Sequence, residues 1–163
     1  MSDFKIKFDK KQLKALKKKT NPDIFERIID KAVKSAADTL EANILEKMDE
    51  MKIHDTGRAG QSLGPVRKLA NAKYYLGFGV EYIKYVEFGS RPHRPPFTPI
   101  FEWVKRKLGY SGDEAKQIAG AIWNKITQKG TKGKHFVQAA IDKGEYQEAF
   151  DKTIQKWLEE VEK

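Results

Sequence analysis

The sequence has no cysteine among its 163 residues, so it can form neither a disulfide framework nor a thiolate metal site. Its three histidines stand far apart and show no His-x-x-x-His or Glu-x-x-His ligand spacing, which argues against a metal site. No segment approaches the ~20 apolar residues of a membrane span, and the lysine-rich N-terminus lacks the apolar stretch of a signal peptide. These absences predict a soluble protein without metal or cofactor, made in a reducing cytosol.

Acidic residues are outnumbered, with 23 Asp and Glu against 32 Lys and Arg and a net charge of +9. Residues 1–19 hold eight lysines against Asp3 and Asp9, a net charge of +6 that leaves +3 for the rest. A candidate basic surface comprises Lys17, Lys18 and Lys19. It could contact nucleic acid or an acidic protein surface. Because no aromatic residue is interleaved with these lysines as a stacking platform, a solvated helix end is the favoured interpretation.

The chain is long enough for one domain, residues 1–163, and its apolar content of 39% supports a single modest core. Alternation from Phe4 to Phe8 predicts a half-buried edge strand, and leucines at helical spacing predict a short helix at 10–19. Residues 1–20 are therefore expected to form a basic strand followed by a short helix.

A long amphipathic helix is predicted over residues 22–53. Asn21 and Pro22 supply a helix start, and apolar residues recur every three or four positions from Phe25 to Met51. At ~1.5 Å per residue this helix spans roughly 45 Å, longer than a small sheet is wide. Part of it should overhang or bend unless a neighbouring subunit covers it, which is a reason to expect an oligomer.

The sheet core is expected within residues 63–90. Residues 74–97 are the densest concentration of aromatic and β-branched side chains in the chain. They predict antiparallel strands at 73–79 and 82–88, joined by a tight turn near Val80-Glu81. A further strand is predicted at 65–69.

Helices are predicted for the rest of the chain. Thr98 should cap the first helix of an insertion over 98–129, and Ser111 should open its second helix with a capping box. C-terminal helices follow at 136–162. The predicted fold class is α+β: a small, mainly antiparallel sheet of about four strands, packed by the long N-terminal helix and a C-terminal helix, with a helical insertion.

Short matches to enzymatic motifs occur in the sequence, but none has the context that its chemistry needs. Gly60-Gln-Ser-Leu-Gly64 matches the nucleophile-elbow pattern, but a helix and a loop precede Ser62 where the elbow needs a strand. His93 and His135 lack the context of a catalytic base. Gly130-Thr-Lys-Gly-Lys134 lacks the spacing of a phosphate loop. The sequence therefore predicts no catalytic residue, and a small serine hydrolase using Ser62 is the remote alternative.

Glu87 stands inside the apolar run, where an unpaired buried carboxylate would be costly. Two interpretations are open: Glu87 faces water on the outer side of the sheet, or it forms a salt bridge with Arg58, Arg91 or Arg94, within the subunit or across an interface. A candidate contact loop follows, comprising Arg91, Pro92, His93 and Arg94. Its prolines would lower the entropy lost on docking, although a rigid spacer explains them equally well.

Three segments carry a resemblance to a known family. Gly77-Phe-Gly-Val-Glu-Tyr-Ile-Lys-Tyr-Val-Glu-Phe-Gly-Ser-Arg-Pro resembles the strand pair of the tailed-bacteriophage head-tail joining family, also labelled neck, tail-completion, minor tail component or virion morphogenesis proteins. Asp55-Thr-Gly-Arg-Ala-Gly-Gln-Ser-Leu63 is similar to the family's Thr-Gly-Arg-Leu-x-x-Ser-Ile segment, and residues 130–140 are similar to its Arg-Pro-Phe-Leu-x-Pro-Ala segment. The family-motif positions are Thr56, Gly57, Arg58, Ser62, Tyr85, Glu87, Phe88 and Gly89.

The resemblance implies a structural, non-enzymatic protein of a phage or prophage neck. Such a protein joins the head connector to the tail as a ring, commonly of six copies. Its partners would be its own copies, head-connector or head-completion proteins, and tail tube or tail terminator proteins, with DNA in the channel as a transient contact. It would occupy the bacterial host cytoplasm during assembly and then the virion. The alternative from composition is a nucleic-acid-binding accessory protein that uses the basic N-terminus.

Overall fold

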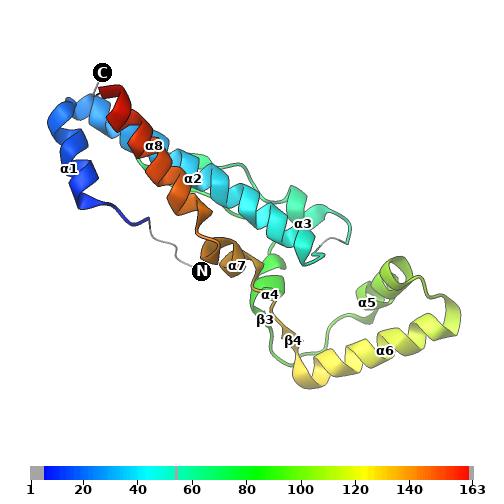
Figure 1. Cartoon of the computed structure of the whole chain (residues 1–163). Coiled ribbons are helices and arrows are strands. Elements are labelled where there is room, and N and C mark those ends of the chain that lie inside the picture. The colour runs from blue at the N-terminus through cyan, green and yellow to red at the C-terminus, as the bar shows by residue number, and fades with distance from the viewer. Residues whose placement is uncertain (1–5, 54, 162–163) are drawn as a thin grey trace.

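The computed structural model describes residues 6–53 and 55–161. It consists of an elongated helical body and a helical arm that projects from one end of the body (Figure 1). Two short paired strands join these parts. We call this connection the stem.

Helix α2 (Pro22–Glu50) is the axis of the body. The Asn21 side chain accepts a hydrogen bond from Ile24 N at 2.8 Å, as a helix-starting residue should. Helix α8 (Glu145–Val161) lies along α2 and runs in the opposite direction, with α1 (Lys10–Lys19) across their shared end (Figure 1). The first core between these helices comprises Leu16, Ile28, Ala32, Ala36, Phe150, Ile154 and Leu158. The helices predicted at 10–19 and 22–53 are confirmed, with α2 ending at Glu50.

A second core covers the other half of α2. It brings α2 together with α7 (Phe136–Asp142), with the short helix α3 (Arg58–Gln61) and with α4 (Ile83–Phe88). Its buried residues are Leu40, Ile44, Met48, Ala59, Leu63, Phe136 and Ala140. Buried residues of α2 therefore run from Ile28 to Met48, and the chain itself covers the helix. The predicted overhang of the long helix is wrong, because the sheet is not what α2 mainly packs against.

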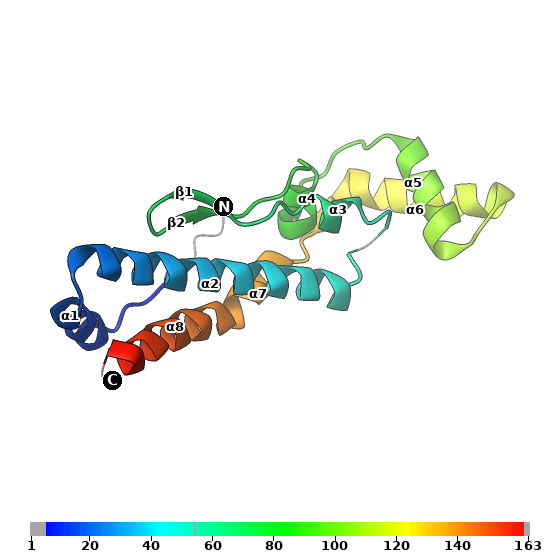
Figure 2. The same cartoon turned by 90° about the horizontal axis from the view of Figure 1, so that it is seen from above.

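The strands form two separate two-stranded antiparallel sheets. Strands β1 (Arg67–Ala70) and β2 (Lys73–Tyr75) make a hairpin that lies on the side of α2 away from α8 (Figure 2). The stem consists of β3 (Gly89–Ser90) and β4 (Thr131–Lys132). The α+β class is confirmed, although the strands do not join into one sheet and most of the chain is helical.

Three of the predicted strands need correction. Residues 82–88 form no strand, because Ile83–Phe88 is helix α4. Residues 73–79 are extended only in part: β2 ends at Tyr75, and Phe78 makes an isolated bridge with Leu63. Of the predicted strand at 4–8, residues 4 and 5 lie outside the described residues, and residues 6–8 have no strand conformation.

The arm contains α5 (Phe97–Trp103), the π-helical turn η1 (Val104–Leu108) and α6 (Gly112–Lys129). Val104, Ala115 and Ala119 form its small core. The helical prediction for 98–129 is confirmed, but both predicted caps are wrong. Helix α5 begins after Pro96 instead of Thr98, and the Ser111 side chain makes no capping hydrogen bond. Within the described ranges no helix is both long and apolar enough to cross a membrane.

Candidate assembly surface

Glu87 is buried, with only 3% of its surface exposed, and it points into the body. Its Oε2 accepts a hydrogen bond from Val137 N at 2.9 Å, and its Oε1 accepts one from Gln138 N at 3.2 Å. The carboxylate therefore caps the N-terminus of α7, where the first backbone N–H groups lack partners inside the helix and a negative charge is favourable. The interpretation in which Glu87 faces water is wrong, and among residues 6–53 and 55–161 no ion pair joins Glu87 to Arg58, Arg91 or Arg94.

A signal for this cap is visible in the sequence in retrospect. Helix α7 begins at Phe136 after His135, whose side chain makes no capping hydrogen bond, so the helix start has no local acceptor. An uncapped helix that starts in the protein interior needs an acceptor from elsewhere in the chain. Glu87 is a carboxylate within an apolar run, so it could supply this acceptor.

The stem continues the connection between α4 and α7. Lys134 N donates to Val86 O at 2.8 Å, and His135 N donates to Glu87 O at 3.0 Å. In the stem itself, Gly89 pairs with Lys132. The first and third family-like segments are thus hydrogen-bonded to each other through residues more than 40 positions apart in the sequence.

The second family-like segment packs against the same region. Gly57, with φ of 77°, turns the chain into α3. Gly79 N donates to Ser62 O at 2.7 Å, while the Ser62 hydroxyl donates to Ala59 O at 2.8 Å. Two family-motif residues, Thr56 and Arg58, are exposed beside this turn. All three family-like segments therefore converge at the junction of α3, α4 and α7.

The outward side of α4 carries an aromatic face, which we define as Tyr82, Tyr85 and Phe88. These residues recur every three positions, so they share one side of the helical turn. Tyr85 is 53% exposed and Phe88 is 54% exposed, while Ile83 and Val86 of the same turn pack inward on the second core. Aromatic side chains grouped in this way on a surface are typical of a protein–protein contact.

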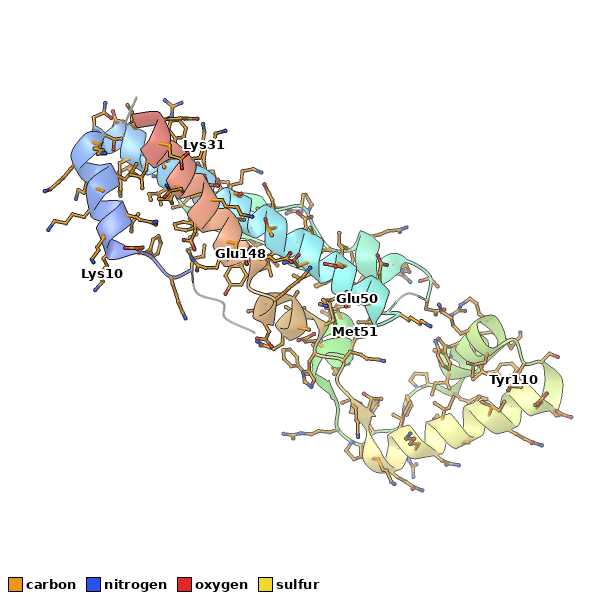
Figure 3. All side chains as sticks on the ribbon, in the orientation of Figure 1. Lys10, Lys31, Glu50, Met51, Tyr110 and Glu148 are labelled. Atoms are coloured by element: carbon orange, nitrogen blue, oxygen red, sulfur yellow. The ribbon has the colours of Figure 1, made fainter. Side chains whose placement is uncertain are left out.

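The arm exposes a second group of large apolar side chains. The arm surface comprises Trp103, Leu108 and Tyr110. Tyr110 lies at the far end of the molecule from Lys10 of α1 (Figure 3). The chain therefore presents two apolar surfaces, one on the body and one on the arm.

The predicted contact loop follows β3 and is exposed at Arg91, Pro92, His93 and Arg94. The His93 ring Nδ1 lies 3.0 Å from Arg91 O, which fixes the loop locally. The candidate basic surface of Lys17, Lys18 and Lys19 occupies the last turn of α1, at the opposite end of the molecule. The structure does not bring these two predicted regions together.

The surroundings of Ser62 differ from those of a nucleophile elbow. Two surface hollows, of about 390 and 500 Å³, lie along α8, and neither is lined by Ser62, His93 or His135. A short helix, not a strand, precedes Ser62. In the part of the chain that the structure describes, no group of three or more His, Asp or Glu side chains could hold a metal ion.

Asp55 and Arg106 form an ion pair that ties the arm to the loop after α2, with Arg106 Nε donating to Asp55 Oδ1 at 3.0 Å. This hydrogen bond lowers the pKa of the Asp55 carboxyl, and the charges of Arg106 and Lys107 act in the same direction, against the opposing effect of burial. The folded-state pKa thus lies below the unfolded value of about 3.9. The stability that the pair contributes is present above about pH 4 and is lost as the pH falls through the folded-state pKa.

We expect carbon-detected NMR titration of Asp55 to give an apparent pKa below its ordinary value. The Arg106→Gln variant should raise that pKa toward the ordinary value, whereas Lys105→Gln should leave it unchanged, because Lys105 pairs with Glu102. An ordinary titration of Asp55 in the unaltered protein would contradict the ion pair.

Comparison of the chain with protein-family models, with curated proteins and with solved structures gives no match in any of the three.

Proposed function

We propose that the chain is a structural, non-enzymatic protein of the head-tail junction of a tailed phage or prophage. It acts by forming a ring with its own copies and by binding head-connector or head-completion proteins and tail tube or tail terminator proteins. The observation that carries this proposal is the aromatic face of α4, which lies within the family-like segment and is exposed.

Anchoring makes the aromatic face suitable for assembly. Helix α4 is held from behind by the Glu87 cap on α7 and by the packing of Ile83 and Val86. A contact surface that is already rigid loses less conformational entropy when a partner binds. Within the family-like segment, Glu87 thus stabilises the fold, whereas Tyr85 and Phe88 are exposed and can contact another chain.

Ring closure needs two different surfaces on each copy. A head-to-tail contact joins one patch to a second, distinct patch, and a ring forms when the rotation closes. The aromatic face on the body and the arm surface on the projecting arm supply two such patches. We therefore propose that the arm of one copy docks on α4 of the next.

This proposal predicts that Tyr85→Glu and Tyr110→Glu each weaken self-association at least about tenfold, the effect of losing about 1.4 kcal/mol. A buried carboxylate in an apolar contact opposes association because it must lose its water. The matched control is Leu69→Glu, which adds the same charge at an exposed apolar residue of the β1–β2 hairpin.

Sedimentation velocity and negative-stain microscopy, with and without purified tail tubes, provide the measurement. The unaltered protein and Leu69→Glu should form rings, alone or on the tubes, and the two tyrosine variants should not. Rings that form equally well in all variants would remove the aromatic face from the contact. A protein that stays monomeric and does not bind tail tubes would contradict the proposed function itself.

A further inference from the structure

The stem and its flanks contain charge of one sign only. Residues 88–101 and 115–141 include seven lysines and arginines and no aspartate or glutamate. Pairing of β3 with β4 brings these two acid-free segments side by side. We define the basic stem by its six cations: Arg91, Arg94, Lys125, Lys129, Lys132 and Lys134.

The described part of the chain provides no acidic partner for the cations of the basic stem. All six are exposed, and among the ion pairs of residues 6–53 and 55–161 none involves them. Three of the four other cations of the arm are paired, Lys105 with Glu102, Arg106 with Asp55, and Lys116 with Asp113, and Lys107 is the exception among the described ion pairs. Like charges that are gathered without counter-charges repel one another and attract a polyanion.

We propose that the basic stem binds the sugar-phosphate backbone of a nucleic acid. Arginine and lysine are the main phosphate-binding side chains, and several of them spaced along an exposed ribbon match the repeated charges of a strand. The site is distinct from the candidate basic surface at Lys17, Lys18 and Lys19, which lies at the other end of the molecule.

An aromatic platform favours a nucleic acid over an acidic protein as the partner. Phe97, three residues after Arg94, is 41% exposed. Its ring stacks on Phe101 with a centroid separation of 6.2 Å, which holds it in place. Bases stack on aromatic rings placed beside a basic track. Helix α1 has the lysines but no aromatic residue among them.

Fluorescence anisotropy with a labelled 30-nucleotide single strand and a 30-base-pair duplex, over a range of salt concentrations, tests the proposal. The stem variant carries R91Q, R94Q, K129Q, K132Q and K134Q. The matched control carries K10Q, K11Q, K14Q, K17Q and K18Q, so it loses the same five charges at the opposite end. Circular dichroism establishes that both variants retain the helical content of the unaltered protein.

We expect the stem variant to bind at least about tenfold more weakly at low salt, and the control to stay within about threefold of the unaltered protein. The slope of log K against log salt should become shallower by about 3.5 in the stem variant, from about 0.7 per lost phosphate contact on a single strand. We also expect the protein to bind the single strand more tightly than the duplex. Loss of this preference in Phe97→Ala would identify the stacking platform as part of the site.

Three results would overturn the proposal. The first is that the control variant loses as much affinity as the stem variant. The second is that the unaltered protein binds neither nucleic acid at low salt. The third is that polyglutamate displaces the DNA completely at equal charge concentration. The last result would assign the surface to an acidic protein.

If the five-residue variant does not fold, the pair R91Q and K132Q, one from each segment, should still make the slope shallower by about 1.4. None of these outcomes depends on ring formation, so the site and the proposed function can fail separately.

Discussion

Replacement of Glu87 by alanine is expected to lower the free energy of unfolding by about 3 kcal/mol. The Glu87 carboxylate accepts two hydrogen bonds, from Val137 N and Gln138 N, and its removal leaves both donors without an acceptor at a buried helix start. Hydrogen bonds to a charged group contribute about 1.5–3 kcal/mol each, and unsatisfied buried donors are costly. Glu87→Gln should cost somewhat less, about 2 kcal/mol. Its single amide oxygen can still accept one of the two bonds, but the other backbone N–H then faces the amide NH2, and the favourable charge at the helix N-terminus is lost.

Urea unfolding followed by circular dichroism measures this effect, with Glu81→Ala as the control. Glu81 is an exposed glutamate six residues earlier, so its removal should change the stability by no more than about 0.5 kcal/mol. Hydrogen exchange at Val137 and Gln138 should accelerate in Glu87→Ala. Equal stability of the Glu87 and Glu81 variants would show that α7 does not need the carboxylate.

Gly130→Ala is expected to cost about 3 kcal/mol and to open the stem. Gly130 ends α6 with φ of 70° and ψ of −159°, a conformation that is essentially confined to glycine and costs other residues about 1–3 kcal/mol. In addition, a Cβ at this position would lie 2.8 Å from the carbonyl carbon of Arg91 and 3.0 Å from that of Ser90. These are backbone atoms on the facing strand, so the clash cannot be relieved by moving a side chain.

The same helix supplies a control for this substitution. Gly120 lies in the middle of α6, and nothing lies within 4 Å of a Cβ added there. Gly120→Ala should therefore stabilise the arm by about 0.5–1 kcal/mol. Tryptophan fluorescence during urea unfolding reports the difference, since Trp103 and Trp123 lie in the arm. A Gly130→Ala protein as stable as the unaltered one would mean that the stem does not require a glycine there.

The helices could be predicted from the sequence because their signals are local. Apolar periodicity, the Asn21 cap and the terminal glycines Gly109 and Gly130 all lie within the helices or next to them. A long run such as residues 22–50 repeats its pattern enough times to exclude a strand. The α+β class followed from the same signals together with the short extended segments.

The conformation of residues 82–88 could not be predicted because it depends on distant contacts. Seven residues are too few to separate a period of 2 from one of 3.6, and the aromatic content favoured a strand. The deciding contact is between Glu87 and the start of α7, 50 residues later in the chain. Sequence reasoning noticed Glu87 as anomalous but had no means of locating its partner.

The basic stem was missed for a related reason. The N-terminal lysines are adjacent in the sequence and attract attention, whereas the cations of the stem are spread over 44 residues, from Arg91 to Lys134. Only the pairing of β3 with β4 concentrates them. The sequence does carry a signal for it, since residues 88–101 and 115–141 both lack aspartate and glutamate. This signal indicates a basic surface only when the two segments are known to lie side by side.

The narrowness of the stem has a mechanical consequence. The ladder between arm and body has two residues in each strand, Gly89–Ser90 and Thr131–Lys132. Such a thin ribbon resists torsion weakly, so elastic deformation under load concentrates there while the helices on either side keep their internal geometry. In a closed assembly of the proposed kind, each copy would adjust the tilt of its arm to the local curvature by changing the stem and the Asp55–Arg106 ion pair, without repacking the cores of the body or of the arm.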